Sequence, residues 1–283
     1  MTADPFRRSS ATPGVPQERH FDNRHVEVDP AEVKACCAAV YEHDLVALVL
    51  GPSYHPGGQD LTRRLARALE LRPGERILDV ASGPGTTAFL LAEEFGATVD
   101  GVDAGALTVE RARTGAAQRN LADRVRFCCA DAEALPFDDG AFDAVVCECA
   151  FCTFPDQEAA AAGFARVLRP GGRVGLTDVT VDGERLDPEL RTLAGHVACL
   201  AGARPEGDYQ ALLAGAGLRV VRTEAHDEAL ARMVDHIDAR LRALGAIGLP
   251  GVDLAAAEPY LAAAARAVNS GIAGYRLLAA VKS

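Results

Sequence analysis

Cysteines near the end of one predicted strand are the residues of this 283-residue chain with the most distinctive chemistry. Residues 145–156 read VVCECAFCTFPD. Strand alternation would place Cys147 and Cys149 on one face, with Cys149 where the strand ends. Thiolates bind soft ions well, so these side chains could hold a soft centre. The alternative is that cysteines within a strand are small apolar core residues, which is our interpretation of Cys128 and Cys129.

A glycine-rich turn is the second feature with clear chemistry. Residues 77–87 read ILDVASGPGTT, and glycines between a strand and a helix let the backbone approach a ligand closely. Asp103, at the end of the next strand, can accept hydrogen bonds from both ribose hydroxyls of an adenosine cofactor. Asp79 inside the turn would repel a pyrophosphate and suits a cationic cofactor, which disfavours a nicotinamide dehydrogenase. The predicted cofactor residues are Asp79, Ala81, Ser82, Gly83, Gly85, Asp103, Ala104, Asp131, Ala132 and Glu148.

Short β-rich runs that alternate with helical stretches must position these residues. The expected strands are 76–81, 97–102, 124–129, 142–149, 172–178, 218–224 and 274–281. Helical stretches near 86–95, 105–118 and 157–168 lie between the first five. Repeated strand–helix units predict an α/β fold whose seven-stranded, mostly parallel sheet is covered on both faces.

The remaining segments are expected to surround this sheet. We expect a disordered tail over 1–28 and an N-terminal helical cap over 29–72, with one helix running from Asp29 towards Leu50 and another over about 60–70. The domain proper would span 73–283, with helical insertions near 184–216 and 227–270. The later insertion could be a lid or an oligomer contact. Further residues expected to help enclose the site are Tyr41, Tyr54 and 184–204.

Charge and composition exclude several functional classes. The chain has 29 basic and 40 acidic residues and a formal charge of −11, and its only lysines are Lys34 and Lys282. This balance argues against nucleic acid and against an anionic membrane as partners. Neither a run of membrane-spanning length nor an apolar signal segment within residues 1–23 is present, so we expect a cytoplasmic protein with reduced cysteines.

Five segments together resemble the class I S-adenosylmethionine-dependent methyltransferases. They are 77–85, 101–103, 130–137, 142–146 and 166–172. The resemblance implies a Rossmann-like class I methyltransferase fold and S-adenosyl-L-methionine as the cofactor. Ala81 departs from the glycine that the family usually has at this position.

A narrower resemblance is to the arsenite methyltransferases. Cys149 precedes a Pro-Asp pair and Cys199 precedes a run of small residues, as the two arsenic-binding cysteines of that family do. The family also uses an upstream cysteine for thiol exchange, for which Cys36 and Cys37 are the candidates. Glu148 stands where that family tends to have asparagine.

This resemblance implies a mechanism. Cys149, Cys199 and Cys37 or Cys36 would hold a trivalent metalloid as thiolates, and its lone pair would attack the sulfonium methyl group. Neighbouring thiols would reduce the oxidised product and become a disulfide, which a thiol reductant such as thioredoxin would reopen.

Three other interpretations stay open. The first is a methyltransferase of an organic small molecule in a biosynthetic pathway, with His55, His196 or His226 as the base, of which His55 is preferred because its Pro/Gly-rich loop could close over the cofactor. The second is a structural zinc site at the three cysteines of 147–152, although zinc ligands usually come in separated pairs. The third is a cofactor-binding sensor without enzymatic activity.

Overall fold

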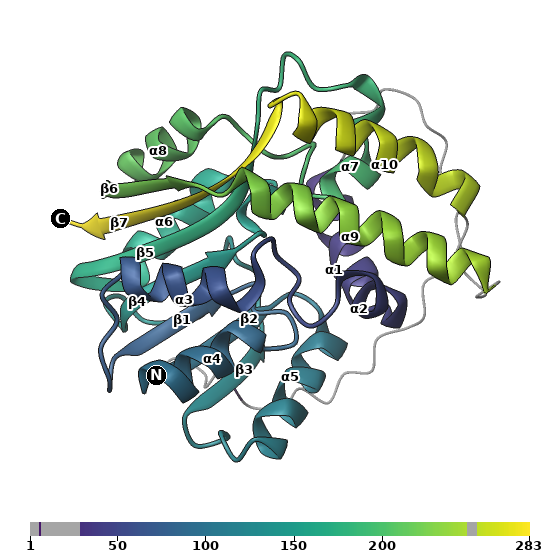
Figure 1. The fold of residues 1–283 in the computed structure, drawn as a ribbon. Helices are drawn as coiled ribbons and strands as arrows, with labels where there is room; N and C mark the ends of the chain where they lie inside the picture. Colours follow the sequence, from purple (N-terminus) through teal and green to yellow (C-terminus); the bar gives the residue numbers. More distant parts are fainter. Residues whose placement is uncertain (1–5, 7–28, 248–253) are drawn as a thin grey trace.

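The computed structural model describes Phe6 and residues 29–247 and 254–283, and these form a seven-stranded sheet with helices on both faces (Figure 1). The strands are β1 (Arg76–Val80), β2 (Thr98–Asp103), β3 (Val125–Cys129), β4 (Phe142–Glu148), β5 (Leu168–Val181), β6 (Leu218–Ala225) and β7 (Ala273–Lys282). Their order is β3-β2-β1-β4-β5-β7-β6. Strands β1 to β5 run parallel, while β7 is antiparallel to both of its neighbours. This topology confirms the predicted fold class.

Two hydrophobic layers pack on the two faces of the sheet. Because side chains alternate along a strand, Ile77 of β1 joins one layer and Leu78 joins the other. The first face is covered by α3 (Gly58–Ala68), α4 (Thr86–Phe95) and α5 (Ala106–Gln118). The second face is covered by α6 (Gln157–Val167) and α8 (Glu206–Gly215). The sheet edge where β1 to β4 end is left for the site.

The N-terminal segment forms two helices where one was expected. Helix α1 (Pro30–Tyr41) begins as predicted, with the Asp29 carboxylate accepting from Ala31 N at 3.0 Å. It ends before His43, whose extended backbone (ψ 133°) and imidazole cap the separate helix α2 (Asp44–Leu50). The prediction of a continuous helix to Leu50 is wrong because His43 provides this second helix start.

The other predicted additions are helical where described. Between β5 and β6 lie the short 3-10 helix η2 (Pro188–Leu190), α7 (Leu193–Val197) and α8, and between β6 and β7 lie α9 (Asp227–Ala246) and α10 (Leu254–Asn269). Helix α9 reaches α2, where Arg240 Nη1 donates to Val49 O at 2.8 Å. The expected tail over 1–28 lies outside the described residues apart from Phe6, whose ring lies 6.1 Å from that of Phe137.

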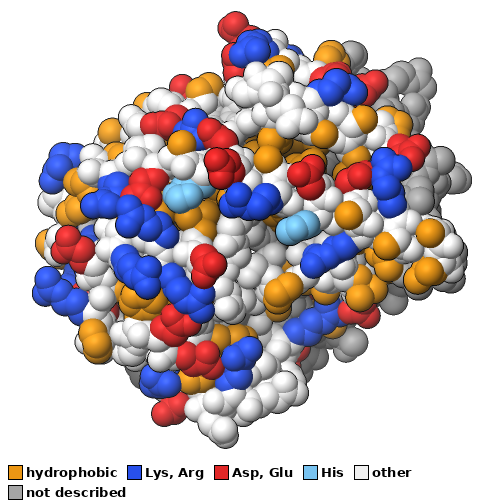
Figure 2. All heavy atoms as spheres, in the orientation of Figure 1, with side chains coloured by type: hydrophobic (Ala, Val, Ile, Leu, Met, Phe, Trp, Pro, Cys, Tyr) orange, Lys and Arg blue, Asp and Glu red, His pale blue; other side chains and the backbone are white. Residues whose placement is uncertain are grey.

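The described surface is mixed in charge. On the face drawn in Figure 2, Lys and Arg side chains lie among Asp and Glu side chains. Ion pairs form on the described surface, for example Arg64 with Glu224 at 2.6 Å. Within residues 29–247 and 254–283, no helix is both long and apolar enough to cross a membrane.

Candidate functional site

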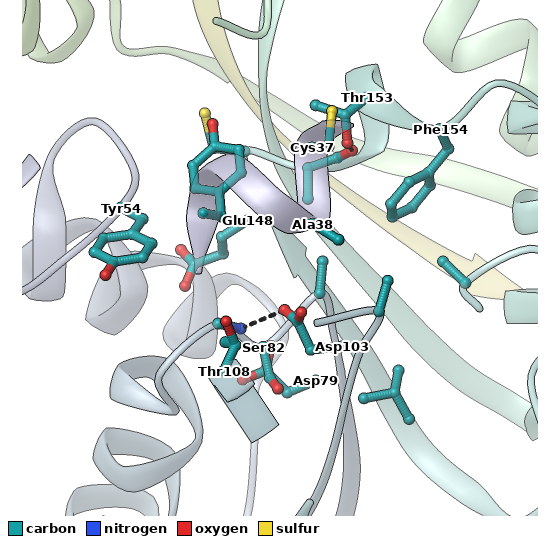
Figure 3. Close-up of a pocket in the computed structure, with 18 of the residues that line it drawn as sticks. Cys37, Ala38, Tyr54, Asp79, Ser82, Asp103, Thr108, Glu148, Thr153 and Phe154 are labelled. Atoms are coloured by element: carbon teal, nitrogen blue, oxygen red, sulfur yellow. Dashed lines mark hydrogen bonds between the residues drawn. The ribbon is translucent and has the colours of Figure 1, made fainter. Parts of the chain in front are cut away.

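A cavity of about 590 Å³ lies at the carboxyl ends of β1 to β4 (Figure 3). Ligands of open α/β sheets bind at this edge. Nine of the ten predicted cofactor residues line the cavity, and Gly85 is the one that does not. Helix α1 and residues 53–55 close the cavity on the side away from the sheet, and both Tyr41 and Tyr54 line it.

The glycine-rich turn is fixed by its packing and by one carboxylate. Gly85 has φ +90°, and a Cβ there would lie 2.7 Å from Phe127 and 2.8 Å from Phe89, so only glycine fits. Asp103 accepts from Gly83 N and from Gly105 N, both at 2.9 Å (Figure 3 shows the first). These bonds occupy one lone pair on each oxygen and leave another on each for ribose hydroxyls.

Ala81 holds a left-handed backbone without being glycine. Its φ is +57°, a conformation that costs an alanine roughly 1 kcal/mol. This explains why glycine is usual at the position in the resembled family, and it shows that the turn is retained here despite the strain.

Asp79 is a buried carboxylate that lacks a partner on one oxygen. Its side chain faces the cavity at 2% exposure, and among the described residues Oδ2 has no hydrogen-bond partner. Burial, with the neighbouring Glu148 and Asp103 carboxylates, raises the pKa of Asp79 well above its usual range. A cation bound in the cavity would stabilise this charge, and S-adenosylmethionine carries both a sulfonium and an ammonium group. The residues present therefore fit the predicted cofactor.

Glu148 forms a second buried carboxylate site, beside His55. Thr87 Oγ1 donates to Glu148 Oε2 at 2.6 Å and Thr62 Oγ1 donates to the same oxygen at 2.9 Å. His55 Nε2 lies 3.6 Å from that oxygen, and both side chains are under 10% exposed and line the cavity. The two threonines therefore orient the carboxylate, and His55 is the histidine positioned to exchange a proton inside the cavity.

Asp131, after β3, meets a residue that we did not predict. Lys34 of α1 pairs with Asp131 at 2.7 Å and with Glu133. Although burial acts in the opposite direction, the hydrogen bond from Lys34 lowers the pKa of Asp131 below its usual value. Asp131 and Ala132 line the end of the cavity at which β3 stops.

The two cysteines of the predicted acceptor site lie together. Cys149 Sγ is 3.9 Å from Cys199 Sγ, and Cys199 Sγ is 3.4 Å from the carbonyl oxygen of Cys149. Both residues have left-handed backbones, with φ +54° at Cys149 and +60° at Cys199. Such conformations in non-glycine residues persist only where the surrounding structure enforces them, and they concentrate at functional sites.

The expectation that Cys147 and Cys149 share a face is wrong. Strand β4 ends at Glu148, and the left-handed backbone of Cys149 turns its side chain to the layer opposite that of Cys147. Cys147 is fully buried in the layer that contains α6 and α8. It is therefore a core residue, while Cys149 lines the cavity.

Cys199 is the thiol that the surrounding groups favour as a thiolate. The Cys149 thiol, which donates to Cys199 Sγ, and the neighbouring Cys152 and Tyr41 side chains hold the pKa of Cys199 well below its usual range despite its burial. Burial and the nearby Cys199 raise the pKa of Asp178 to about 7. Cys199 does not line the cavity itself, and it lies behind Cys149.

The upstream cysteines separate into an inner and an outer residue. Cys37 lines the cavity from α1, and burial with the nearby Cys199 raises its pKa to about 12. Cys36, one position away on the helix, does not line the cavity. Of the two candidates for a third thiol, Cys37 is the one that faces the site.

The remaining cysteine and histidine candidates differ in their position relative to the cavity. Cys128 is buried as expected, but Cys129 is exposed and lines the cavity, because alternation at the end of β3 turns it outward. His196 and His226 are not among the lining residues. Among the described residues, no group of three or more His, Cys, Asp or Glu side chains is arranged to hold a metal ion, so the zinc interpretation finds no support.

Some residues of the site could be found only in the folded chain. Thr62 lies on a helix that precedes the sheet, Lys34 is 97 residues from Asp131, and Thr87 had no role in the predicted turn. The helical spacing of Lys34, Cys37 and Tyr41 was the one available signal, because it places the three side chains on one face of α1.

The family comparison matches a methyltransferase domain to residues 77–172. The methyltransferase GfsG of Streptomyces halstedii is 35% identical over 163 residues, 57% of this chain and 59% of that protein. An arsenite methyltransferase of Halobacterium salinarum is 34% identical over 165 residues, 56% of this chain and 41% of that protein. The chain therefore spans about half the length of these two relatives.

A third relative is matched over more of its length. The 27-O-demethylrifamycin SV methyltransferase of Amycolatopsis mediterranei is 35% identical over 192 residues, which are 62% of this chain and 70% of that protein. The fold is also that of a solved structure, the Haemonchus contortus phosphoethanolamine N-methyltransferase 2 in complex with S-adenosyl-L-methionine. That likeness has a TM-score of 0.72 at 18% identity and covers 91% of this chain and 58% of the other.

Proposed function

Because the chain belongs to the class I S-adenosylmethionine-dependent methyltransferases, we propose that it methylates a trivalent metalloid such as arsenite, held by Cys149 and Cys199. The observation that carries the proposal is the 3.9 Å separation of the two sulfurs at the wall of the cofactor cavity. A zinc–thiolate bond is about 2.3 Å long, so two sulfurs at this separation can both bind one central atom of similar size.

Each thiol has a distinct part in this proposal. Cys199, with the lowered pKa, is the thiolate that displaces the first oxygen ligand of the metalloid. Cys149 then provides the second sulfur from the cavity wall, and Cys37, which lines the cavity from α1, is the candidate for a third. Sulfur ligation leaves the lone pair of the trivalent centre free to point into the cavity.

The cofactor half of the site, formed by the glycine-rich turn and the ends of β1 to β4, completes the arrangement. S-adenosylmethionine, when bound, supplies an electrophilic methyl group on a positively charged sulfur. Asp103 holds a hydroxyl-bearing ligand through its free lone pairs, while Asp79 and Glu148 provide negative charge near the cavity floor. The chain contributes mainly by bringing the two reactants together in one enclosed space.

Turnover also needs reducing equivalents. Cys149 and Cys199 can give two electrons and two protons to an oxidised, pentavalent product and become a disulfide. A dithiol reductant such as thioredoxin would then reduce this disulfide by thiol exchange. We propose such a reductant as the partner of the protein.

The test is a direct assay for methylated arsenic. Purified protein is incubated with S-adenosylmethionine, arsenite, glutathione and a thioredoxin system, and the arsenic species are separated and quantified by mass spectrometry. We expect methylated products from the wild type and from Cys147→Ser, a buried cysteine on the other face of β4. Methylation that persists in the Cys149→Ser, Cys199→Ser double variant would overturn the proposal.

One observation favours a second candidate, methylation of an organic small molecule. His55 faces the cavity beside the oriented carboxylate of Glu148, and a histidine–carboxylate pair can take a proton from an oxygen or nitrogen acceptor. The relative from Amycolatopsis mediterranei, whose name states a rifamycin substrate, adds support. In that case His55→Asn would abolish transfer to the organic acceptor, whereas the double cysteine variant would remain active.

A further inference from the structure

Helix α1 forms one wall of the cavity along its whole length. Lys34, Cys37, Ala38 and Tyr41 all line the cavity, and their spacing places them on one helix face. Figure 3 shows Cys37 and Ala38 above the carboxylates of the cofactor half. The wall thus extends from Asp131, which pairs with Lys34, to Cys199, which lies next to Tyr41.

The residues beneath this wall are almost inaccessible to solvent. Asp79 is 2% exposed, and the side chains of His55 and Glu148 are 7% and 4% exposed. A cofactor that contacts them would therefore lie between the sheet edge and helix α1. The wall made by the ends of β1 to β4 is part of the main core, in which Ile77 of β1 and Val146 of β4 are buried.

Helix α1 is the wall with the least apolar anchoring. Val33 is its one buried residue, and α2, which follows, has none. Polar contacts hold it instead. They are the ion pairs of Lys34 with Asp131 and Glu133, the bond from Tyr41 OH to Val197 O at 2.9 Å, and the bond from Leu107 N to Glu42 Oε1 at 2.8 Å. Segments with few buried apolar contacts open locally at low cost.

We infer that α1 is the movable cover of the cofactor cavity and that Lys34 is the positioning residue that holds it closed over Asp131. Closure by Lys34 at one end of the helix brings Cys37 and Tyr41 towards Cys149 and Cys199 at the other end. A single movement therefore encloses the cofactor and completes the acceptor site. This inference does not depend on which acceptor the enzyme methylates.

The direct test measures ligand exchange without turnover. The probe is S-adenosylhomocysteine, and its dissociation rate is compared among wild type, Lys34→Met, Lys34→Arg and Lys282→Met. Partly exposed ion pairs are individually weak, so we expect dissociation from Lys34→Met to be about three- to ten-fold faster. Lys34→Arg should restore the wild-type rate because it keeps the charge. Lys282 is the matched control. It donates to Leu168 O and does not line the cavity.

Hydrogen exchange over residues 30–41 identifies the moving element. We expect faster exchange in Lys34→Met than in wild type or Lys282→Met, and protection when S-adenosylhomocysteine is added. An unchanged dissociation rate together with unchanged exchange in Lys34→Met would overturn the inference, as would failure of Lys34→Arg to restore either.

A second readout needs no substitution. Lys34 and Lys282 are the only lysines, so reductive methylation with ¹³C-formaldehyde labels two side chains that NMR can resolve. We expect the Lys34 signal to move with ionic strength and with S-adenosylhomocysteine, while the Lys282 signal stays fixed. A Lys34 signal that responds to neither would contradict a cover held by this ion pair.

Discussion

The cofactor half and the thiol half of the cavity are built in different ways. The cofactor half consists of strand ends and a turn that belong to the core, such as Asp79 and Gly85. The thiol half joins residues 50 positions apart, Cys149 after β4 and Cys199 after α7, each in a left-handed backbone. The cofactor half therefore follows from the ends of the strands, whereas the thiol half depends on two strained residues that are distant in the sequence. Strain itself is common to both halves, because Ala81 of the cofactor turn also has a positive φ.

The largest effect on stability should come from the cofactor half. In Gly85→Ala, the new Cβ would meet Phe127 and Phe89 within 3 Å at a φ of +90°, which combines overpacking with backbone strain. We expect a loss of about 2–4 kcal/mol in the free energy of unfolding, measured by urea denaturation. The matched control is Gly140→Ala, where φ is +68° but the nearest atom, Arg169 Cα, lies 3.7 Å away. A control loss as large as that of Gly85→Ala would show that packing at the turn is unimportant.

Asp79→Asn should separate cofactor binding from stability. The folded pKa of Asp79 is raised, so its charge destabilises the unliganded protein as pH rises above about 4 and costs nothing below that pH. The substituted amide cannot ionise, and we therefore expect unliganded Asp79→Asn to be more stable than wild type at pH 7, with a smaller difference at pH 4. Affinity for S-adenosylmethionine should fall about ten-fold or more because a cationic ligand loses its buried partner.

Calorimetric titration and thermal unfolding at the two pH values measure both effects. The control is Asp139→Asn, an exposed carboxylate that pairs with Arg166 at 2.9 Å away from the cavity. Lower stability of Asp79→Asn at pH 7, or unchanged affinity for the cofactor, would mean that Asp79 has another partner in solution.

The sequence could predict the cofactor half because its residues obey regular geometry. Strand ends share one edge of a parallel sheet, so Asp79, Asp103 and Asp131 could be placed near one another from their positions alone. Prediction from regular geometry failed where the backbone departs from that geometry. Period-two alternation gave the wrong face for Cys149, and nothing in the local pattern signals its positive φ.

Long-range pairing is the other limit on prediction. The end of α1 depended on His43, which has no strong helix-ending signal of its own. Lys34 meets Asp131 only because α1 folds over the sheet edge. The pairing of Cys149 with Cys199 came from a family resemblance, and the role of both cysteines stays a prediction until the arsenic assay is done.

The smallest expected effect concerns Cys152. It lies fully buried in η1 (Phe151–Thr153), and its thiol is one of the groups that hold the pKa of Cys199 below its usual range. Removing this thiol in Cys152→Ala should raise the pKa of Cys199, so less of Cys199 is thiolate at neutral pH. Since the thiolate is the nucleophile, alkylation of Cys199 by iodoacetamide at pH 7 should slow about two- to five-fold, with its half-maximum at a higher pH.

The matched control for this measurement is Cys147→Ala, a fully buried cysteine in the opposite layer. Mass spectrometry of the peptide that contains Cys199 reports its alkylation in each variant. Equal pH profiles in the two variants would mean that Cys152 is a core residue like Cys147. A shift confined to Cys152→Ala would extend the thiol half of the site to a third cysteine, one that tunes Cys199 from behind the cavity wall and has no counterpart in the cofactor half.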